Sequence, residues 1–202
     1  MFESDCDLED EDESLKSRRL MFHTPRPADA AELARLADNI KVAANLASMP
    51  NPYTRADADA WIARAASPRE RAGEFLLRLR APDTPLVGGV GYKPAEDGGP
   101  GVEIGYWIGE PFWGCGLATE AAQRLLDHIF RNPDIRVAHA ACRVTNNPSR
   151  RVIEKCGFQW AGTGLARFVA LGGMTAVDRY RLDRSIWCSI KAWGAAEAAR
   201  TR

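Results

Sequence analysis

The chain has 202 residues, 46% hydrophobic and 27% charged, and its 27 basic and 27 acidic side chains give a net charge of +0. This length suits one domain with a substantial core, and the balanced charge gives no general argument for binding nucleic acid or an anionic membrane surface. No apolar run approaches a membrane span, and the N-terminus lacks the basic and apolar regions of a signal peptide.

Cysteine usage indicates the redox compartment. The cysteines are odd in number and scattered, without a Cys-x-x-Cys pair or a ligand-like cluster: Cys6, Cys115, Cys142, Cys156 and Cys188. We therefore expect a reduced, cytoplasmic protein that binds no metal, no nucleic acid and no membrane.

The N-terminal stretch is strongly acidic. Eight of the first thirteen residues are Asp or Glu, a composition that repels itself and buries little surface. We expect residues 1–17 to form an acidic disordered tail. A solvated tail is the simplest interpretation, and an interaction tail or an autoinhibitory mimic of a polyanion is the alternative.

Next come a strand and several helices. Residues 20–24 have strand character, residues 28–38 and 40–47 have helical composition, and residues 55–66 form another helix containing Trp61. The prolines of residues 49–54 exclude regular helix between the last two helices.

The middle of the chain predicts a meander of antiparallel strands. Strands are expected at 74–80, 86–92 and 102–108, with a Gly- and Pro-rich turn at 93–101. The last strand leads through a glycine-bearing turn at 114–118 into a helix. Backbone N–H groups and the positive end of the helix dipole would converge at that turn, which suits a phosphate group. The alternative is a plain glycine turn between two core elements.

The last part of the chain contains another strand, turn and helix, and no internal repeat is visible. A strand at 137–144 is followed by an Asn-Asn-Pro turn and a short helix, capped by Ser or Asn and stopped at Gly157. Residues 168–169 and 177–182 suggest a last hairpin. We expect one domain over residues 18–187, with 188–202 as a C-terminal extension.

Two motifs resemble one family. The segment IGYWIGEPFWGCGLATEA resembles the acyl-CoA-binding segment of the GNAT superfamily of N-acetyltransferases, in its RimJ/RimL-type branch, through Trp113-x-x-Gly116-x-Ala118. The second motif is Asn146-x-x-Ser149 followed by Glu-Lys-x-Gly-Phe. The resemblance covers about residues 18–187, and two motifs in the right order make it more specific than either alone.

The resemblance implies both a fold and a function. The fold would be an α/β (α+β) GNAT acyl-CoA N-acyltransferase fold, with a mixed, mostly antiparallel sheet flanked by helices. The function would be transfer of an acetyl group from acetyl-CoA to a primary amine by direct attack in a ternary complex. A protein N-terminus and a small amine both remain open as acceptors, and so does a homodimer. The alternative is a non-catalytic GNAT-fold module that binds CoA or serves regulation or interaction.

The resemblance also implies site residues. The main chain of Tyr106, Trp107 and Ile108 would lie beside the pantetheine, and one N–H there would polarise the thioester carbonyl. Asn146 would contact the pantetheine arm, and Tyr53 and Trp61 would line the acceptor groove, although aromatics next to helices more often pack in the core. The pyrophosphate would be bound by N–H groups of Gly114, Cys115, Gly116, Leu117, Ala118 and Thr119.

Acid–base groups are harder to assign. Many GNAT enzymes have a Tyr at the position of Ile153 and some have a Glu at the position of Ala141, so both are excluded here. The branch instead suggests Ser149 as the partner of the departing thiolate, with helix capping as its alternative role. Glu103 is the next candidate base, directly or through water. Its alternative is a strand-end carboxylate facing solvent or an Arg.

Overall fold

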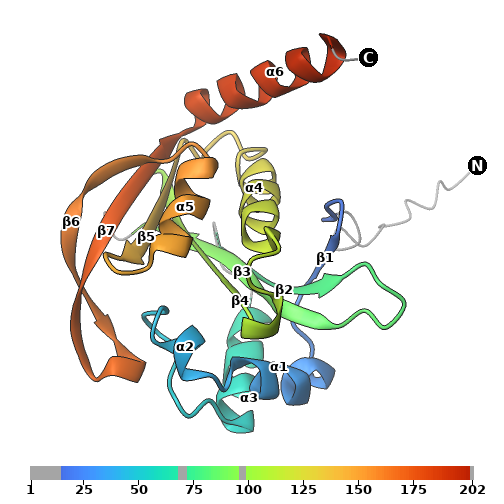
Figure 1. The fold of residues 1–202 in the computed structure, drawn as a ribbon, viewed down its shortest axis with the longest axis vertical. Coiled ribbons are helices and arrows are strands. Elements are labelled where there is room, and N and C mark those ends of the chain that lie inside the picture. The colour runs from blue at the N-terminus through green and yellow to red at the C-terminus, as the bar shows by residue number, and fades with distance from the viewer. Residues whose placement is uncertain (1–14, 68–71, 96–98, 201–202) are drawn as a thin grey trace, which may run out of the picture.

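The computed structural model describes residues 15–67, 72–95 and 99–200, with the side chains described through residue 194. These residues contain a seven-stranded sheet in the order β1-β2-β3-β4-β5-β7-β6 (Figure 1). The strands are β1 Leu20–His23, β2 Gly73–Leu79, β3 Leu86–Pro94, β4 Gly101–Ile108, β5 Val137–Arg143, β6 Gln159–Phe168 and β7 Gly173–Asp183. The α-helices are α1 Ala30–Ala37, α2 Ile40–Ala43, α3 Arg55–Ala65, α4 Leu117–Ile129, α5 Asn147–Lys155 and α6 Arg184–Arg200.

The strand pairing leaves an opening in the middle of the sheet. Strands β1 to β4 form an antiparallel meander, whereas β4 and β5 are parallel. Their ladder joins Gly101–Glu103 to Val137–His139 only, although β4 continues to Ile108 and β5 to Arg143. The last residues of β4 and β5 are therefore not paired with each other, and a gap opens between the two strands.

Helices cover both faces of the sheet. The side chains of each strand alternate between the two faces, so apolar residues of one strand pack against helices on either side. On β4, Val102, Ile104 and Ile108 join the larger core cluster with residues of α4 and α5. Trp107 packs instead against the smaller cluster formed with α1 and α3. In Figure 1, α4 and α5 lie in the upper part of the view and α1 to α3 in the lower part, with β3 and β4 between them.

Most expected elements are confirmed, and the expected mixed, mostly antiparallel sheet flanked by helices is correct. The last hairpin is longer than expected, because β6 begins directly after α5. Its Gly162 and Gly164 have low strand propensity, so the sequence pattern there is weak. Trp187 is buried at the start of α6 and packs 6.5 Å from the ring of Phe130.

Most of the expected acidic tail, residues 1–14, lies outside the described residues. Leu15 is buried in the larger core cluster, and the Ser17 hydroxyl donates a hydrogen bond to Glu120. None of the helices in the described segments is long and apolar enough to cross a membrane.

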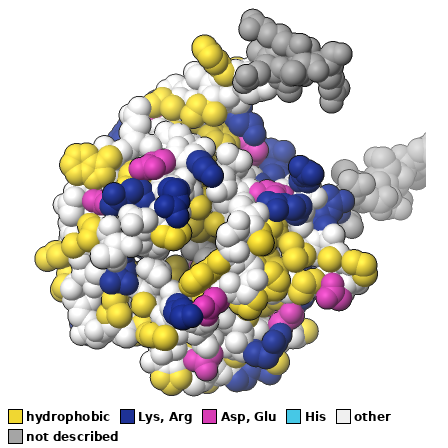
Figure 2. Space-filling view, viewed as in Figure 1, with side chains coloured by type: hydrophobic (Ala, Val, Ile, Leu, Met, Phe, Trp, Pro, Cys, Tyr) yellow, Lys and Arg dark blue, Asp and Glu magenta, His cyan; other side chains and the backbone are white. Residues whose placement is uncertain are grey.

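Strand β6 forms one edge of the sheet and is largely exposed. Trp160 and Leu165 keep 64% and 61% of their surface, and Met174 on the neighbouring β7 keeps 61%. Figure 2 shows hydrophobic side chains on the side of the molecule where β6 and β7 lie.

Candidate functional site

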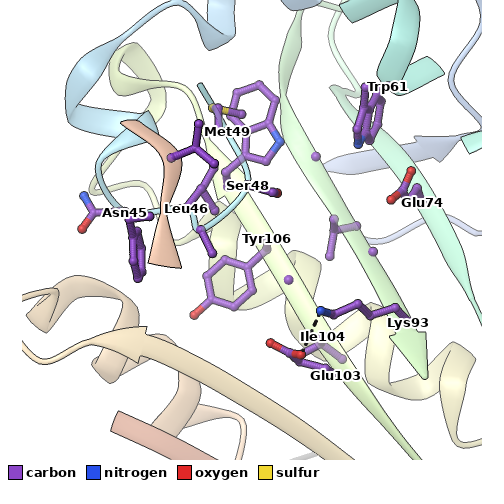
Figure 3. Close-up of a pocket in the computed structure, with 18 of the residues that line it drawn as sticks. Asn45, Leu46, Ser48, Met49, Trp61, Glu74, Lys93, Glu103, Ile104 and Tyr106 are labelled. Carbon is purple, nitrogen blue, oxygen red and sulfur yellow. Dashed lines mark ion pairs between the residues drawn. The ribbon is translucent and has the colours of Figure 1, made fainter. Parts of the chain in front are cut away.

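A cavity of about 590 Å³ lies against β3 and β4 and is lined from both faces of β4, by Glu103 and Trp107 on one face and by Ile104 and Tyr106 on the other. Its walls come from the loop after α2, from α3, from β2 to β5 and from the end of β6 (Figure 3). The loop after α2 is held in place by two hydrogen bonds. The N–H of Val169 donates to Ala47 O at 3.0 Å, and Arg143 Nη1 donates to Ala44 O at 3.1 Å.

Aromatic side chains from several elements line this cavity. Tyr53 and Trp61, both expected in an acceptor groove, are found in its wall together with Trp107. Tyr53 is only 7% exposed, and burial followed by the nearby carboxylate of Asp57 raises its pKa to about 12. The phenol of Tyr53 is therefore neutral at physiological pH.

Two carboxylates in the wall differ in their partners. Glu103 lies 3.2 Å from the ammonium of Lys93 across the β3–β4 pair, and 33% of its side chain is exposed. Its partner is thus a Lys in place of the Arg of its alternative role, and both roles stay open. Glu74 on β2 has a buried Oε2 that accepts no hydrogen bond from the described residues. In Figure 3, Glu74 lies near Trp61, away from the Lys93–Glu103 pair.

Tyr106 connects the cavity to α5. Its side chain lines the cavity, and its hydroxyl lies 2.9 Å from the Ser149 hydroxyl and 3.2 Å from Ser149 O. Figure 3 shows the Tyr106 hydroxyl directed away from the Lys93–Glu103 pair. Burial raises the pKa of Tyr106 strongly, although the hydrogen bond with Ser149 opposes this. The phenol is therefore neutral, and its hydroxyl can donate to Ser149 O.

Helix α5 begins with a side-chain cap, and the residue that caps it is Asn146. Its Oδ1 accepts a hydrogen bond from the Ser149 N–H at 3.2 Å. The capping role considered for Ser149 is therefore wrong, because Ser149 lies inside the first turn and its hydroxyl faces Tyr106. Ile153, at the position of the missing Tyr, is 1% exposed and belongs to the core.

The turn between β4 and α4 is held in a defined shape. The Trp113 indole N–H donates to Ile108 O at 2.6 Å, which fastens the start of the turn to the end of β4. Gly114 and Gly116 both have φ of +75°, a backbone conformation in which a side chain is strained. An added Cβ at Gly114 would meet nothing within 4 Å, so the space beside the turn is open.

Helix α4 begins at this turn without a side-chain cap. Its N-cap residue is Gly116, so no side-chain oxygen accepts from the N–H groups of the first turn. Leu117 is buried, Ala118 packs against the core, and Cys115 is exposed. The main chain from Gly114 to Thr119 thus fits a phosphate group, since it combines open space, unclaimed N–H groups and the positive end of the helix dipole.

The predicted site residues form three groups. Glu103, Tyr106, Trp107, Tyr53 and Trp61 all line the cavity, whereas Asn146 and Ser149 meet it only through Tyr106. The turn and first helical turn, Gly114 to Thr119, lie outside the cavity lining at the far end of β4.

Sequence reasoning missed three side chains at this site. The resemblance implies a role only for the main chain of Tyr106, and so it does not point to the phenol. Glu74 and Lys93 lie on strands whose carboxylate and ammonium could equally face solvent. In the described part of the chain, no group of three or more His, Cys, Asp and Glu residues is arranged to hold a metal ion.

Comparisons with known proteins bear on this site. Residues 19–159 match the family described as acetyltransferase (GNAT) domain. The ribosomal-protein-serine acetyltransferase of Escherichia coli (strain K12) is 33% identical over 73 residues, which are 36% of this chain and 41% of that protein. The matches span about half of the length of the first curated relatives, or less.

Solved structures share the fold. RimL, a ribosomal L7/L12 α-N-protein acetyltransferase in complex with coenzyme A, has a TM-score of 0.72 at 22% identity, over 83% of this chain and 95% of that chain. A spermidine N-acetyltransferase from Vibrio cholerae, in complex with CoA and spermine, has a TM-score of 0.70 at 18% identity, over 84% and 98%. The resemblance stated from the two sequence motifs is confirmed by the match over residues 19–159, and the chain belongs to the family of GNAT acetyltransferase domains.

Proposed function

We propose that this protein is an acetyl-CoA-dependent N-acetyltransferase that transfers an acetyl group to a primary amine. The observation that carries the proposal is the contact between Tyr106 and Ser149, because it joins the cavity to α5 beside the gap between β4 and β5. Acetyl-CoA enters between α4 and α5, and the amine is held in the cavity. The two meet at this gap, which the cavity reaches through Tyr106. The CoA in the RimL structure supports the same assignment.

Acetyl-CoA is held along β4 and the two helix N-termini. The main-chain N–H groups from Gly114 to Thr119 bind the pyrophosphate. The main chain of Tyr106, Trp107 and Ile108 lies beside the pantetheine arm. Because Asn146 Oδ1 accepts from Ser149, the amide NH₂ of Asn146 is the part that contacts the pantetheine.

Acetyl transfer then needs three catalytic roles: polarising the carbonyl, accepting a proton and stabilising the thiolate. One main-chain N–H of β4 polarises the thioester carbonyl, and the neutral amine attacks its carbon. The proton that the amine loses goes to Glu103, directly or through water. As the C–S bond breaks, the electron pair stays on sulfur, and Ser149 donates a hydrogen bond to the thiolate. Donation from the Tyr106 hydroxyl to Ser149 Oγ, one of the two directions open to this contact, would leave the Ser149 proton to point at the sulfur.

The acceptor occupies the cavity of about 590 Å³. Tyr53, Trp61 and Trp107 provide apolar walls, and Glu74 and Glu103 provide acceptors for an amine or a second polar group. Both a protein N-terminus and a small amine suit these walls. The E. coli relative that acts on a ribosomal protein supports the first, and the spermidine acetyltransferase supports the second.

The experiment is release of CoA from acetyl-CoA, measured with a panel of amines. The panel contains short peptides with free N-termini, the same peptides with blocked N-termini, and spermidine. We expect amine-dependent CoA release with at least one free amine and none with the blocked peptides. Tight acetyl-CoA binding with no release for any amine would instead favour the non-catalytic CoA-binding module.

A further inference from the structure

Arg19, directly before β1, reaches across to the turn that opens α4. Its Nη1 donates to Cys115 O at 2.9 Å, and its Nε donates to Glu120 Oε2 at 2.7 Å. The Arg19 backbone N–H also donates to Glu120 Oε1 at 2.7 Å. Two contacts of the guanidinium and one of the backbone N–H thus fix Arg19 against the turn, although its partners are 96 to 101 residues away in sequence.

One nitrogen of this guanidinium is left for another partner. Nη2 of Arg19 donates no hydrogen bond within the described residues, and it would lie 3.7 Å from a Cβ added at Gly116. The Arg19 side chain keeps 43% of its surface exposed. Nη2 therefore lies beside the main chain of Gly116, at the edge of the open space next to the turn.

The charges around the turn make this position important. Residues 113–119 contain no Lys or Arg, so the turn itself offers a phosphate only N–H groups and the helix dipole. Glu120 lies in the first turn of α4 and opposes an anion there. Burial would raise the pKa of Glu120, but hydrogen bonds from Ser17 and Arg19 outweigh it and lower the pKa, so Glu120 is ionised at neutral pH.

We propose that Arg19 is a CoA-binding residue, whose Nη2 donates to the pyrophosphate held at Gly116 while Nε and Nη1 anchor it to Glu120 and Cys115 O. The inference rests on the proposed function, because the pyrophosphate is placed at this turn by that proposal. A guanidinium presents several donors in a rigid fork, so one edge can be anchored while another binds a phosphate oxygen. Figure 2 shows Lys and Arg side chains gathered over the region of β1 and α4.

Calorimetry with CoA on Arg19→Gln tests the proposal. We expect the Kd for CoA to rise about tenfold, equivalent to 1.4 kcal/mol. Arg80→Gln is the matched control, because Arg80 Nη1 also fastens the N-terminal segment, at Ser17 O, but does not touch the turn. Arg80→Gln should bind CoA like the wild type. Equal affinities for Arg19→Gln and the wild type overturn the proposal, and so does an equal loss in both variants.

A double variant separates binding from charge cancellation. If Arg19 only neutralises Glu120, the variant carrying both Arg19→Gln and Glu120→Gln binds CoA as tightly as Glu120→Gln alone, and the proposal is overturned. If Arg19 contacts the phosphate, the double variant binds about tenfold more weakly than Glu120→Gln alone.

Shortened ligands locate the contact. Dephospho-CoA keeps the pyrophosphate, so the proposal predicts the same loss with it as with CoA. A loss confined to CoA assigns Arg19 to the 3′-phosphate and overturns the proposal.

S-acetylpantetheine tests the same point without phosphates. The wild type and Arg19→Gln should release pantetheine from this substrate at equal rates, and slower release by the variant overturns the proposal. If Arg19→Gln does not fold, Arg19→Lys takes its place, because an ammonium cannot hold Glu120 and reach Gly116 at once.

The two levels of failure are distinguishable. If the wild type does not bind CoA at all, the proposed function falls together with this inference. If the wild type binds CoA and Arg19→Gln binds it equally well, only the role of Arg19 is rejected.

Discussion

The hydroxyl of Tyr106 on β4 lies 2.9 Å from the hydroxyl of Ser149 on α5. This contact crosses from the strand that borders the cavity to the helix that borders the gap between β4 and β5. Many GNAT enzymes have a Tyr on the helix that corresponds to α5, at the position where this chain has the buried Ile153. A tyrosine hydroxyl is nevertheless present near the same helix, and it reaches there from the neighbouring strand.

Ser149→Ala tests the proposed contact with the departing thiolate. The variant removes a hydroxyl that is not the helix cap, so we expect a nearly unchanged melting temperature and acetyl-CoA affinity with a large fall in kcat. Steady-state kinetics, calorimetry and thermal unfolding measure the three quantities. Tyr106→Phe should lower kcat by a smaller factor, because Ser149 remains. A kcat for Ser149→Ala within about threefold of the wild type, under 1 kcal/mol in the barrier, contradicts the role.

Asn146→Ala provides the stability control for this comparison. Loss of the Asn146 cap should lower the free energy of unfolding by about 1 kcal/mol, the typical value for such a cap. Urea unfolding of both variants gives this difference. If Ser149→Ala loses as much stability as Asn146→Ala, the hydroxyl of Ser149 has a structural role that its contacts do not suggest.

The sequence predicts the elements of this fold better than it predicts the contacts between them. Hydrophobic periodicity and the prolines and glycines between segments located most strands and helices, because these signals are local. The contact of Tyr106 with Ser149 joins residues 43 positions apart, and that of Arg19 with Cys115 joins residues 96 apart. No local pattern encodes which side chains such distant elements bring together.

The capping of α5 shows the same limit at short range. The sequence allowed either Ser or Asn as the cap, since both residue types accept from the first N–H groups. Only the backbone of the turn decides, because it places Asn146 before the helix and Ser149 in its first turn. The partner of Glu103 could not be predicted either, since it depends on the register that sets Glu103 opposite Lys93.

A matched pair of charges at Gly114 tests the phosphate site. Both Gly114→Glu and Gly114→Lys are strained by the φ of +75°, at a similar cost of about 1–2 kcal/mol, so their difference reports charge. Nothing within 4 Å blocks an added Cβ there. We expect calorimetry to show CoA binding at least tenfold weaker in Gly114→Glu than in Gly114→Lys. Equal affinities would place the phosphates elsewhere.

Glu103→Gln tests the general base. A positioned base contributes roughly 10²–10⁴-fold, so kcat/KM at neutral pH should fall by about that factor. Because the attacking amine is neutral in both proteins, kcat/KM should rise about tenfold per pH unit towards the pKa of the acceptor in both, and the loss in the variant should stay constant over this range. The measurement is kcat/KM against pH for both proteins. Lys93→Gln removes the ion-pair partner alone, and an equal loss in both variants would mean that only the pair matters.

Asp29→Asn tests how the first helical segment is fastened to the sheet in acid. Asp29, 7% exposed, lies 2.8 Å from Arg78 Nη2 and 3.1 Å from His23 Nε2. Burial would raise the pKa of Asp29, but the Arg78 guanidinium, the Arg26 N–H and His23 outweigh it and lower the pKa below the model-peptide value of 3.8.

A carboxylate with a lowered pKa stabilises the fold fully above its unfolded pKa and loses that stabilisation as the pH falls through its folded pKa. Asp29→Asn should therefore lower the free energy of unfolding by about 2 kcal/mol at pH 7, since it leaves Arg78 with Glu32 alone. The difference from the wild type should shrink as the pH falls below about 3.9. Thermal unfolding between pH 2.5 and 7 measures it. Asp59→Asn, in an exposed pair with Arg55, should change stability by only about 0.3–0.5 kcal/mol. A difference for Asp29→Asn that is as small as this, or that stays constant with pH, contradicts the electrostatic role of Asp29.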